Sequence, residues 1–253
     1  MNSFELEVTD DLQVSFMARV TEFAGSQTGP SSLFVTGGSQ AHLCYPALAP
    51  SLNDARSPLA RCEILLGDER VVPVTSEYSN TALIDGLIGS SDRAPHQKQL
   101  YSPTRDSGVD LAELMAAADP AQTSISDAHS AALRALTHRY AQALRAAPAA
   151  RVVHLGLGPD GHVASNFPRC IDFGIRSPEA ATSFDVTGLN RFWRLTVTMD
   201  FINSSSLVIL SLSGIEKGEV LHKVLSDPES FPAGKINAPN FVIIVDRQAS
   251  LAL

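Results

Sequence analysis

The chain has 253 residues, of which 44% are hydrophobic and 18% charged, a composition that excludes disordered, collagen-like and coiled-coil proteins. Nineteen basic and 27 acidic residues give a net charge of −8 without a run of five cations, so nucleic acid is not an expected partner. The acidic first residues, the lack of an apolar run of membrane-spanning length and three scattered cysteines predict a cytoplasmic protein with reduced thiols, no membrane contact and no obligate protein partner.

Short apolar, β-branched runs alternate with helical patterns along the chain. Continuous apolar runs suit strands covered on both faces, and five occur: Leu33–Thr36, Cys62–Leu66, Arg151–Leu157, Leu207–Leu212 and Phe241–Val245. Apolar residues at helical spacing predict helices over Asp11–Phe23, Ala131–Leu144 and Ile215–Leu225. Strands that alternate with helices indicate an α/β fold with a Rossmann-like, open, mostly parallel sheet and helices on both faces.

Two stretches break this alternation. Residues 94–126 are rich in Pro, Ser, Asp and Ala and predict a loop-rich insertion with a short helix at Leu111–Ala118, within one domain that spans residues 1–253. Phe192–Met199 alternates polar residues such as Arg194 with apolar ones, which is the period of a half-exposed strand. Its polar face either meets solvent or is polar for a functional reason. We therefore expect a small inserted or edge β segment beside the main sheet.

A glycine-rich loop, GLGPDGHVASNFP, follows the third predicted strand over residues 156–168. Open parallel sheets bind ligands beyond the carboxyl ends of their strands, so the loop places His162 where ligands bind. An imidazole with the ordinary pKa of about 6.5 is mostly neutral at pH 7 and can accept a proton from water. In a locally extended loop, Asp160 points the same way as His162 and can fix the tautomer of the ring. The alternative is an ordinary turn with a solvated histidine.

Charged residues also follow the second predicted strand. Asp68 and Arg70 belong to the segment GDER directly after Leu66, which brings them to the same edge of the sheet as His162. A guanidinium stays charged at any working pH, so Arg70 can orient a water or a carbonyl group. The alternative interpretation of this segment is a solvated edge.

A possible phosphate loop follows the first predicted strand. Its residues Gly37, Gly38 and Ser39 can form a nest of backbone amides around a phosphate. The alternative is an ordinary turn, which the same residues would also form. Lys217 adds a positive charge to the already positive start of a predicted helix, which indicates either an anionic ligand or a surface lysine, and Arg194 has the same two interpretations. No spacing of histidine and cysteine predicts a metal site, and the other histidines are interpreted as structural.

Together these motifs resemble the 6-phosphogluconolactonase family, of the glucosamine/galactosamine-6-phosphate isomerase superfamily. GLGPDGHVASNFP is similar to the family's GxGPDGHxAS loop, GDERVVPVTSEYSN to its GDER segment and VTGGSQ to its SGGST loop. RLTVTMDFINSSSLVILSLSGIEKGEVL is similar to its arginine strand and lysine helix. The resemblance covers residues 33–245 and implies hydrolysis of 6-phospho-D-glucono-1,5-lactone, a small sugar phosphate lactone, in the oxidative pentose phosphate pathway without a cofactor.

Carried over residue by residue, the resemblance implies that His162 is the general base that activates water. Asp160 and Asp68 would shape its polar surroundings, and Arg70 would position substrate and water. The contacts to the phosphate and the sugar are implied for Gly37, Gly38, Ser39, Gly158, Arg194, Lys217 and Asn80. A δ-lactone is an activated ester, so a deprotonated water and a stabilised carbonyl oxygen suffice, and no GxSxG nucleophile motif is present.

Two departures from the family pattern concern the loops. Gln40 and Ala41 stand where the family usually has Thr-Pro, which removes one hydroxyl from the expected phosphate loop and leaves the details of phosphate binding open. Asn166 replaces a usual leucine, with little expected effect.

Two other functions are compatible with the loop motif. Glucosamine-6-phosphate deaminases and isomerases share it, but typically have asparagine before the aspartate, tyrosine after Asp-Glu and a catalytic glutamate near the end of the loop. This chain has Pro159, Arg70 and Phe167 at those places, which disfavours aldose-ketose chemistry. A non-catalytic sugar-phosphate sensor would need an output module, and no helix-turn-helix segment is expected before Leu33.

Overall fold

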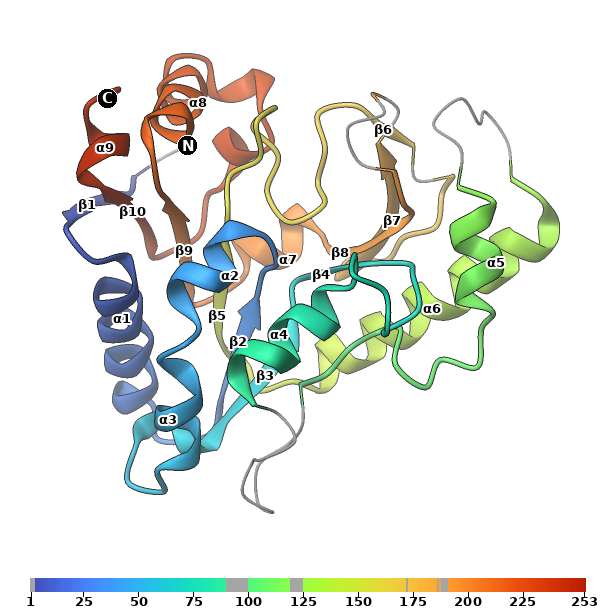
Figure 1. The fold of residues 1–253 in the computed structure, drawn as a ribbon, viewed down its shortest axis with the longest axis horizontal. Helices are drawn as coiled ribbons and strands as arrows, with labels where there is room; N and C mark the ends of the chain where they lie inside the picture. The colour runs from blue at the N-terminus through green and yellow to red at the C-terminus, as the bar shows by residue number, and fades with distance from the viewer. Residues whose placement is uncertain (1–2, 90–99, 119–124, 172, 186, 188–190) are drawn as a thin grey trace.

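The computed structural model describes residues 3–89, 100–118, 125–171, 173–185, 187 and 191–253. Its main sheet has six parallel strands in the order β1-β10-β9-β5-β2-β3 (Figure 1). The strands are β1 (Glu5–Thr9), β2 (Ser31–Val35), β3 (Cys62–Leu66), β5 (Ala150–Leu155), β9 (Leu207–Leu212) and β10 (Phe241–Asp246). The five predicted strands are confirmed with small shifts at their ends, whereas β1 was not predicted.

Helices cover both faces of this sheet, because successive residues of each strand point to opposite faces. Along β2, Leu33 and Val35 join one apolar cluster and Phe34 joins the other. The first cluster contains side chains of α1 (Leu12–Ser26), α2 (Ser39–Cys44), α3 (Leu48–Asn53), η1 (Pro58–Arg61) and α4 (Asn80–Ile88). The second contains side chains of α5 (Leu111–Ala116), α6 (Asp127–Ala146), α7 (Met199–Asn203), α8 (Ile215–Ser226), η4 (Ala233–Lys235) and α9 (Arg247–Ser250). A short helical turn, η3 (Pro228–Ser230), precedes η4. The predicted α/β fold is confirmed.

A second, smaller sheet is antiparallel and has the order β4-β8-β7-β6. Its strands are β4 (Asp68–Arg70), β6 (Cys170–Ile171), β7 (Ala180–Asp185) and β8 (Arg194–Val197). Gly67 is the one residue between β3 of the main sheet and β4, and it bonds to both sheets: its amide donates to Val35 at 2.8 Å and its carbonyl accepts from Val197 at 2.9 Å. The predicted small β segment is therefore confirmed.

The exposure predicted for this segment was wrong. Alternation indicated a half-exposed strand, yet all four residues of β8 are buried. Its polar face turns toward the loop after β5, where the Ser165 amide donates to Thr196 Oγ1 at 3.1 Å. Alternation of polar and apolar residues shows that the two faces of a strand have different surroundings. It does not show whether the polar face meets solvent or a buried polar site.

Capping side chains set the helix ends. Asp11 accepts a hydrogen bond from the Val14 amide, and α1 begins at the next residue. The Ser126 hydroxyl caps α6, which therefore begins four residues before the predicted Ala131. In the predicted insertion, residues 94–99 and 119–124 lie outside the described residues, and α5 is two residues shorter than predicted. Within the described ranges, no helix has the length and apolar character needed to cross a membrane.

Candidate active site

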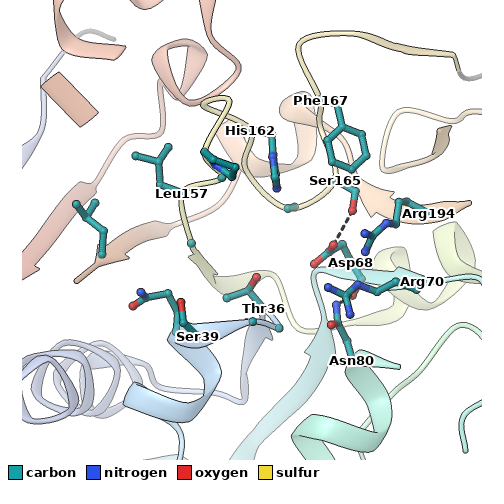
Figure 2. Close-up of a pocket in the computed structure, with 18 of the residues that line it drawn as sticks. Thr36, Ser39, Asp68, Arg70, Asn80, Leu157, His162, Ser165, Phe167 and Arg194 are labelled. Carbon is teal, nitrogen blue, oxygen red and sulfur yellow. Dashed lines mark hydrogen bonds between the residues drawn. The ribbon is translucent and has the colours of Figure 1, made fainter. Parts of the chain in front are cut away.

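The loops that follow β2, β3 and β5 meet at the carboxyl edge of the main sheet, where they enclose a cavity of about 230 Å³ (Figure 2). Of the eleven predicted site residues, ten line this cavity: Gly37, Gly38, Ser39, Asp68, Arg70, Asn80, Gly158, His162, Arg194 and Lys217. The eleventh, Asp160, is not part of this lining but contacts His162 at Nδ1. In Figure 2, His162 and Phe167 face Thr36 and Ser39 across the opening, and the arginines lie to one side. Segments that are far apart in the sequence thus form one polar pocket.

His162 is held by its own loop. Gly161 has φ +77°, a conformation that favours glycine, and the Gly158 amide donates to the His162 carbonyl at 2.9 Å. Asp160 Oδ1 lies 2.5 Å from His162 Nδ1, so the carboxylate accepts the Nδ1 proton and Nε2 is left as the basic nitrogen. Burial raises the pKa of Asp160, but the hydrogen bonds and charge of His162 outweigh it, so that pKa lies below the ordinary value. The aspartate therefore stays charged.

Two further contacts fix the ring. The Phe167 ring packs edge-on against it with centroids 4.9 Å apart. A Cβ atom at Gly158 would lie 2.0 Å from His162 Nδ1, so only glycine leaves room for the imidazole. The sequence predicted Gly158 as a substrate contact. What the structure shows is that this glycine makes space for the imidazole ring.

Asp68 lies at the start of β4 and is buried. The Ser165 hydroxyl donates to Asp68 Oδ2 at 2.6 Å, and the Ser165 amide bonds to β8. These bonds tie the end of the His162 loop to the small sheet. Ser165 belongs to the HVAS part of the loop motif, but nothing in its spacing identified it as a partner of Asp68, 97 positions away.

Glu69 is fully buried and was not predicted as part of the site. Its carboxylate accepts hydrogen bonds from the amides of Arg70, Asn80 and Thr81 at 2.7, 2.8 and 2.8 Å and from the hydroxyls of Ser79 and Thr81. Burial raises its pKa, and these bonds oppose the rise. Glu69 therefore anchors the start of α4 against β4.

Asn80 is the first residue of α4, and its side chain lies against the Gly37–Ser39 loop. Its Nδ2 donates to the Asp68 carbonyl at 3.0 Å, while a Cβ at Gly37 would lie 2.0 Å from its Oδ1. Gly37 is therefore required where the loop and Asn80 meet. Gly38 precedes α2 and has φ +72°, a backbone conformation that favours glycine.

Three cationic side chains line the cavity. Arg70 Nη1 donates to the Tyr78 carbonyl at 2.6 Å, and Lys217 Nζ donates to the Leu157 carbonyl at 2.5 Å. Arg194 is almost completely buried, and burial together with the charge of Arg70 lowers its pKa to about 10. Burial also lowers the pKa of Lys217, against the charges of Asp160 and Glu216. With a pKa of about 10, Arg194 is charged at neutral pH. Together the three cationic side chains of the lining suit an anion, despite the net charge of −8.

A metal centre has no candidate among the described residues, since no three His, Cys, Asp or Glu side chains gather there. His154 is buried, as its apolar strand predicted. His129 Nε2 lies 3.1 Å from Glu113 Oε1 at the surface.

Comparisons with known proteins agree with the motifs. The family described as glucosamine-6-phosphate isomerases/6-phosphogluconolactonase matches residues 6–244. The chain belongs to this family. Within it, the chain is 28% identical to the 6-phosphogluconolactonase of Synechocystis over 242 residues, which cover 93% of this chain and 90% of that protein. It is 28% identical to the Thermotoga maritima 6-phosphogluconolactonase over 194 residues, 76% of each chain.

Solved structures of the family share the fold. The Leishmania guyanensis 6-phosphogluconolactonase superimposes with a TM-score of 0.75 at 22% identity and 98% coverage of both chains. A monomeric glucosamine-6-phosphate deaminase superimposes with a TM-score of 0.69 at 15% identity, over 99% of this chain and 100% of that one. Both branches of the family therefore have this fold, so the fold alone does not distinguish lactone hydrolysis from deamination.

Proposed function

We propose that this chain hydrolyses 6-phospho-D-glucono-1,5-lactone to 6-phosphogluconate in the pentose phosphate pathway, as the names of its relatives suggest. The observation that carries the proposal is a histidine whose Nδ1 is bound by Asp160 in a pocket with three cations. The cations suit a phosphorylated substrate. We also propose that residues 1–253 form one cytoplasmic lactonase domain that needs no cofactor or metal.

The proposed reaction begins when His162 Nε2 takes a proton from water. The resulting hydroxide attacks the lactone carbonyl carbon, and the C–O bond to the ring oxygen breaks when the tetrahedral intermediate collapses. The imidazolium then returns its proton to the departing ring oxygen, so the enzyme ends the cycle unchanged. Asp160 stabilises the charged imidazolium in between. General base catalysis of this kind contributes about 10²- to 10⁴-fold, which suffices for an activated ester.

The remaining pocket residues bind the substrate. Arg194, Lys217 and the Gly37–Ser39 loop would hold the phosphate, because no described residue accepts a hydrogen bond from the amides of Gly37 and Gly38. Arg70 would donate to the carbonyl oxygen as it gains charge. Asp68 and Asn80 would contact the hydroxyl groups of the sugar.

The residues around His162 favour hydrolysis over deamination. Phe167 packs on the imidazole at the place where deaminases typically have a catalytic glutamate. The phenyl ring of Phe167 has no ionisable group, so it cannot serve the acid-base steps of sugar isomerisation.

A lactonase assay tests the proposal directly. Purified protein receives freshly made phosphogluconolactone, and proton release is followed above the spontaneous rate. His162→Ala is expected to remove the acceleration, and Lys217→Ala to raise KM with a smaller effect on kcat. His222→Ala, at an exposed position of α8, is the matched control and should retain wild-type rates. Full activity of His162→Ala would refute the proposed base.

A further inference from the structure

A chain of hydrogen bonds runs through the core beneath the pocket, through residues that the proposed mechanism does not use. The Tyr45 hydroxyl lies 2.8 Å from the Thr36 amide nitrogen and 2.7 Å from His154 Nδ1. His154 Nε2 lies 2.7 Å from Ser211 Oγ, which lies 2.9 Å from Gln40 Oε1. Tyr45, His154 and Ser211 are fully buried, and Gln40 is 5% exposed.

The direction of these bonds follows from the Thr36 amide, which can only donate. The Tyr45 oxygen accepts that bond, and its own buried proton then needs an acceptor, for which the described residues offer only His154 Nδ1. His154 therefore carries its proton on Nε2 and donates to Ser211, whose hydroxyl donates to Gln40 Oε1. The reverse direction would bury the phenolic proton without an acceptor, which is unfavourable.

His154 stays neutral in this position. Burial lowers its pKa to about 3, so the ring holds a single N–H throughout the neutral range. The hydrogen-bond direction set at Thr36 is therefore transmitted to the other end of the chain, where Gln40 Oε1 is occupied as an acceptor.

The other half of the Gln40 carboxamide is left for the cavity. Gln40 lines the pocket beside Ser39 in the first turn of α2, and no described residue accepts a hydrogen bond from its Nε2. Gly156 leaves space for the side chain, because a Cβ there would lie 3.2 Å from Gln40 Cγ. The two N–H groups of Nε2 are thus available to a bound anion.

We propose that Gln40 binds a phosphoryl oxygen of the sugar phosphate through Nε2, and that the buried Tyr45, His154 and Ser211 side chains fix the carboxamide in this orientation. This inference rests on the proposed function, since it assigns a further contact to the same substrate. Gln40 then supplies a donor at the place where the family usually has a threonine hydroxyl. Tyr45, His154 and Ser211 are positioning residues, which act through Gln40.

Two substitutions at Gln40 test the contact. Gln40→Glu retains an acceptor for Ser211 but presents an oxygen to the anion, and Gln40→Met keeps the packing but loses the donors. We expect at least a tenfold rise in KM for phosphogluconolactone in Gln40→Glu, a smaller rise in Gln40→Met and a much smaller change in kcat for both. Gln13→Glu adds the same charge in α1, outside the pocket lining, and should match wild type.

The unphosphorylated glucono-1,5-lactone identifies the group that Gln40 contacts. If the inference is correct, both variants hydrolyse this lactone with nearly the wild-type kcat/KM. An equal loss for the two lactones, or no loss for either, would overturn the assignment to the phosphate. Thermal unfolding of each variant shows that the protein is folded under the assay conditions.

Tyr45→Phe tests the buried chain, because it removes the group that sets the direction. We expect a severalfold rise in KM in the wild-type background. We expect no further rise in Gln40→Met, because this variant has no carboxamide for the buried chain to orient. Equal rises in both backgrounds would refute the positioning role. Calorimetric binding of 6-phosphogluconate separates this inference from the proposed function. If the wild-type protein binds this product but does not hydrolyse the lactone, the proposed function alone is refuted. If the Gln40 variants are active and bind the product with wild-type affinity, the Gln40 assignment alone is refuted.

Discussion

Gly158→Ala is expected to disable the proposed base without removing it. The new Cβ would lie 2.0 Å from His162 Nδ1 and 2.1 Å from Cε1, whereas ordinary contacts of this kind are about 3.4 Å or longer. The ring must therefore move by more than about 1 Å, and such a displacement of a catalytic group costs about 10²-fold in rate. The hydrogen bond between Asp160 and Nδ1 must also lengthen. We therefore expect kcat to fall by at least about 10²-fold and toward the 10⁴-fold limit of lost base catalysis.

The assay is initial-rate hydrolysis of phosphogluconolactone, with 6-phosphogluconate binding as a second measurement. Gly86→Ala is the matched control: Gly86 lies within α4 and its Cβ would meet no heavy atom within 4 Å, so this variant should keep wild-type rates. Product affinity should change little in Gly158→Ala, since the cations remain. A kcat within threefold of wild type, in a folded protein, would show that the position of the His162 ring does not limit the reaction.

Three further predictions concern charge and burial. His154 has a pKa of about 3 when folded and an ordinary value in the unfolded chain, so the unfolded state gains the proton as the pH falls. Between pH 7.5 and 4.5 this removes roughly 3 kcal/mol from the free energy of unfolding. Denaturant titrations of His154→Asn should therefore show a flatter pH dependence. Burial lowers the pKa of Lys217, so calorimetry should show 6-phosphogluconate binding weaken between pH 8 and 10.5 as the ammonium loses its proton, and this weakening should be smaller in Lys217→Arg. Glu69→Gln replaces an acceptor with an amide that faces several donors, so chemical denaturation should show a loss of about 3 kcal/mol.

The fold was largely predictable because its signals are local. Buried parallel strands are continuous apolar runs, and the amphipathic pattern marked the helices between them. β1 was not predicted, because Glu5–Thr9 lies at the edge of the sheet and alternates charged and apolar residues instead of forming a continuous apolar run. The burial of β8 could not be predicted, since a strand that faces a polar pocket has the same alternation as one that faces water.

Site residues could be predicted where they directly follow the end of a strand. They could not be predicted where their role depends on a hydrogen-bond partner from a distant part of the chain. His162 and Asp160 are two positions apart, so their pairing followed from loop geometry. Glu69 was missed because its donors come from the start of α4, and Gln40 was noticed only as a departure from a family pattern. Its partner Ser211 and the next residue of the hydrogen-bond chain, His154, belong to strands that become neighbours only after folding.

The pocket is assembled from separate strand ends, and this separation has an evolutionary consequence. The glycine loop after β2 and the histidine loop after β5 are independent pieces of chain. Mutations in the histidine loop could therefore change the proposed reaction while the glycine loop kept its proposed contact with the phosphate. The description of the family joins isomerases with lactonases. A pocket built from separate loops would allow this, because one loop could keep binding phosphorylated sugars while substitutions in another loop changed which bond is broken.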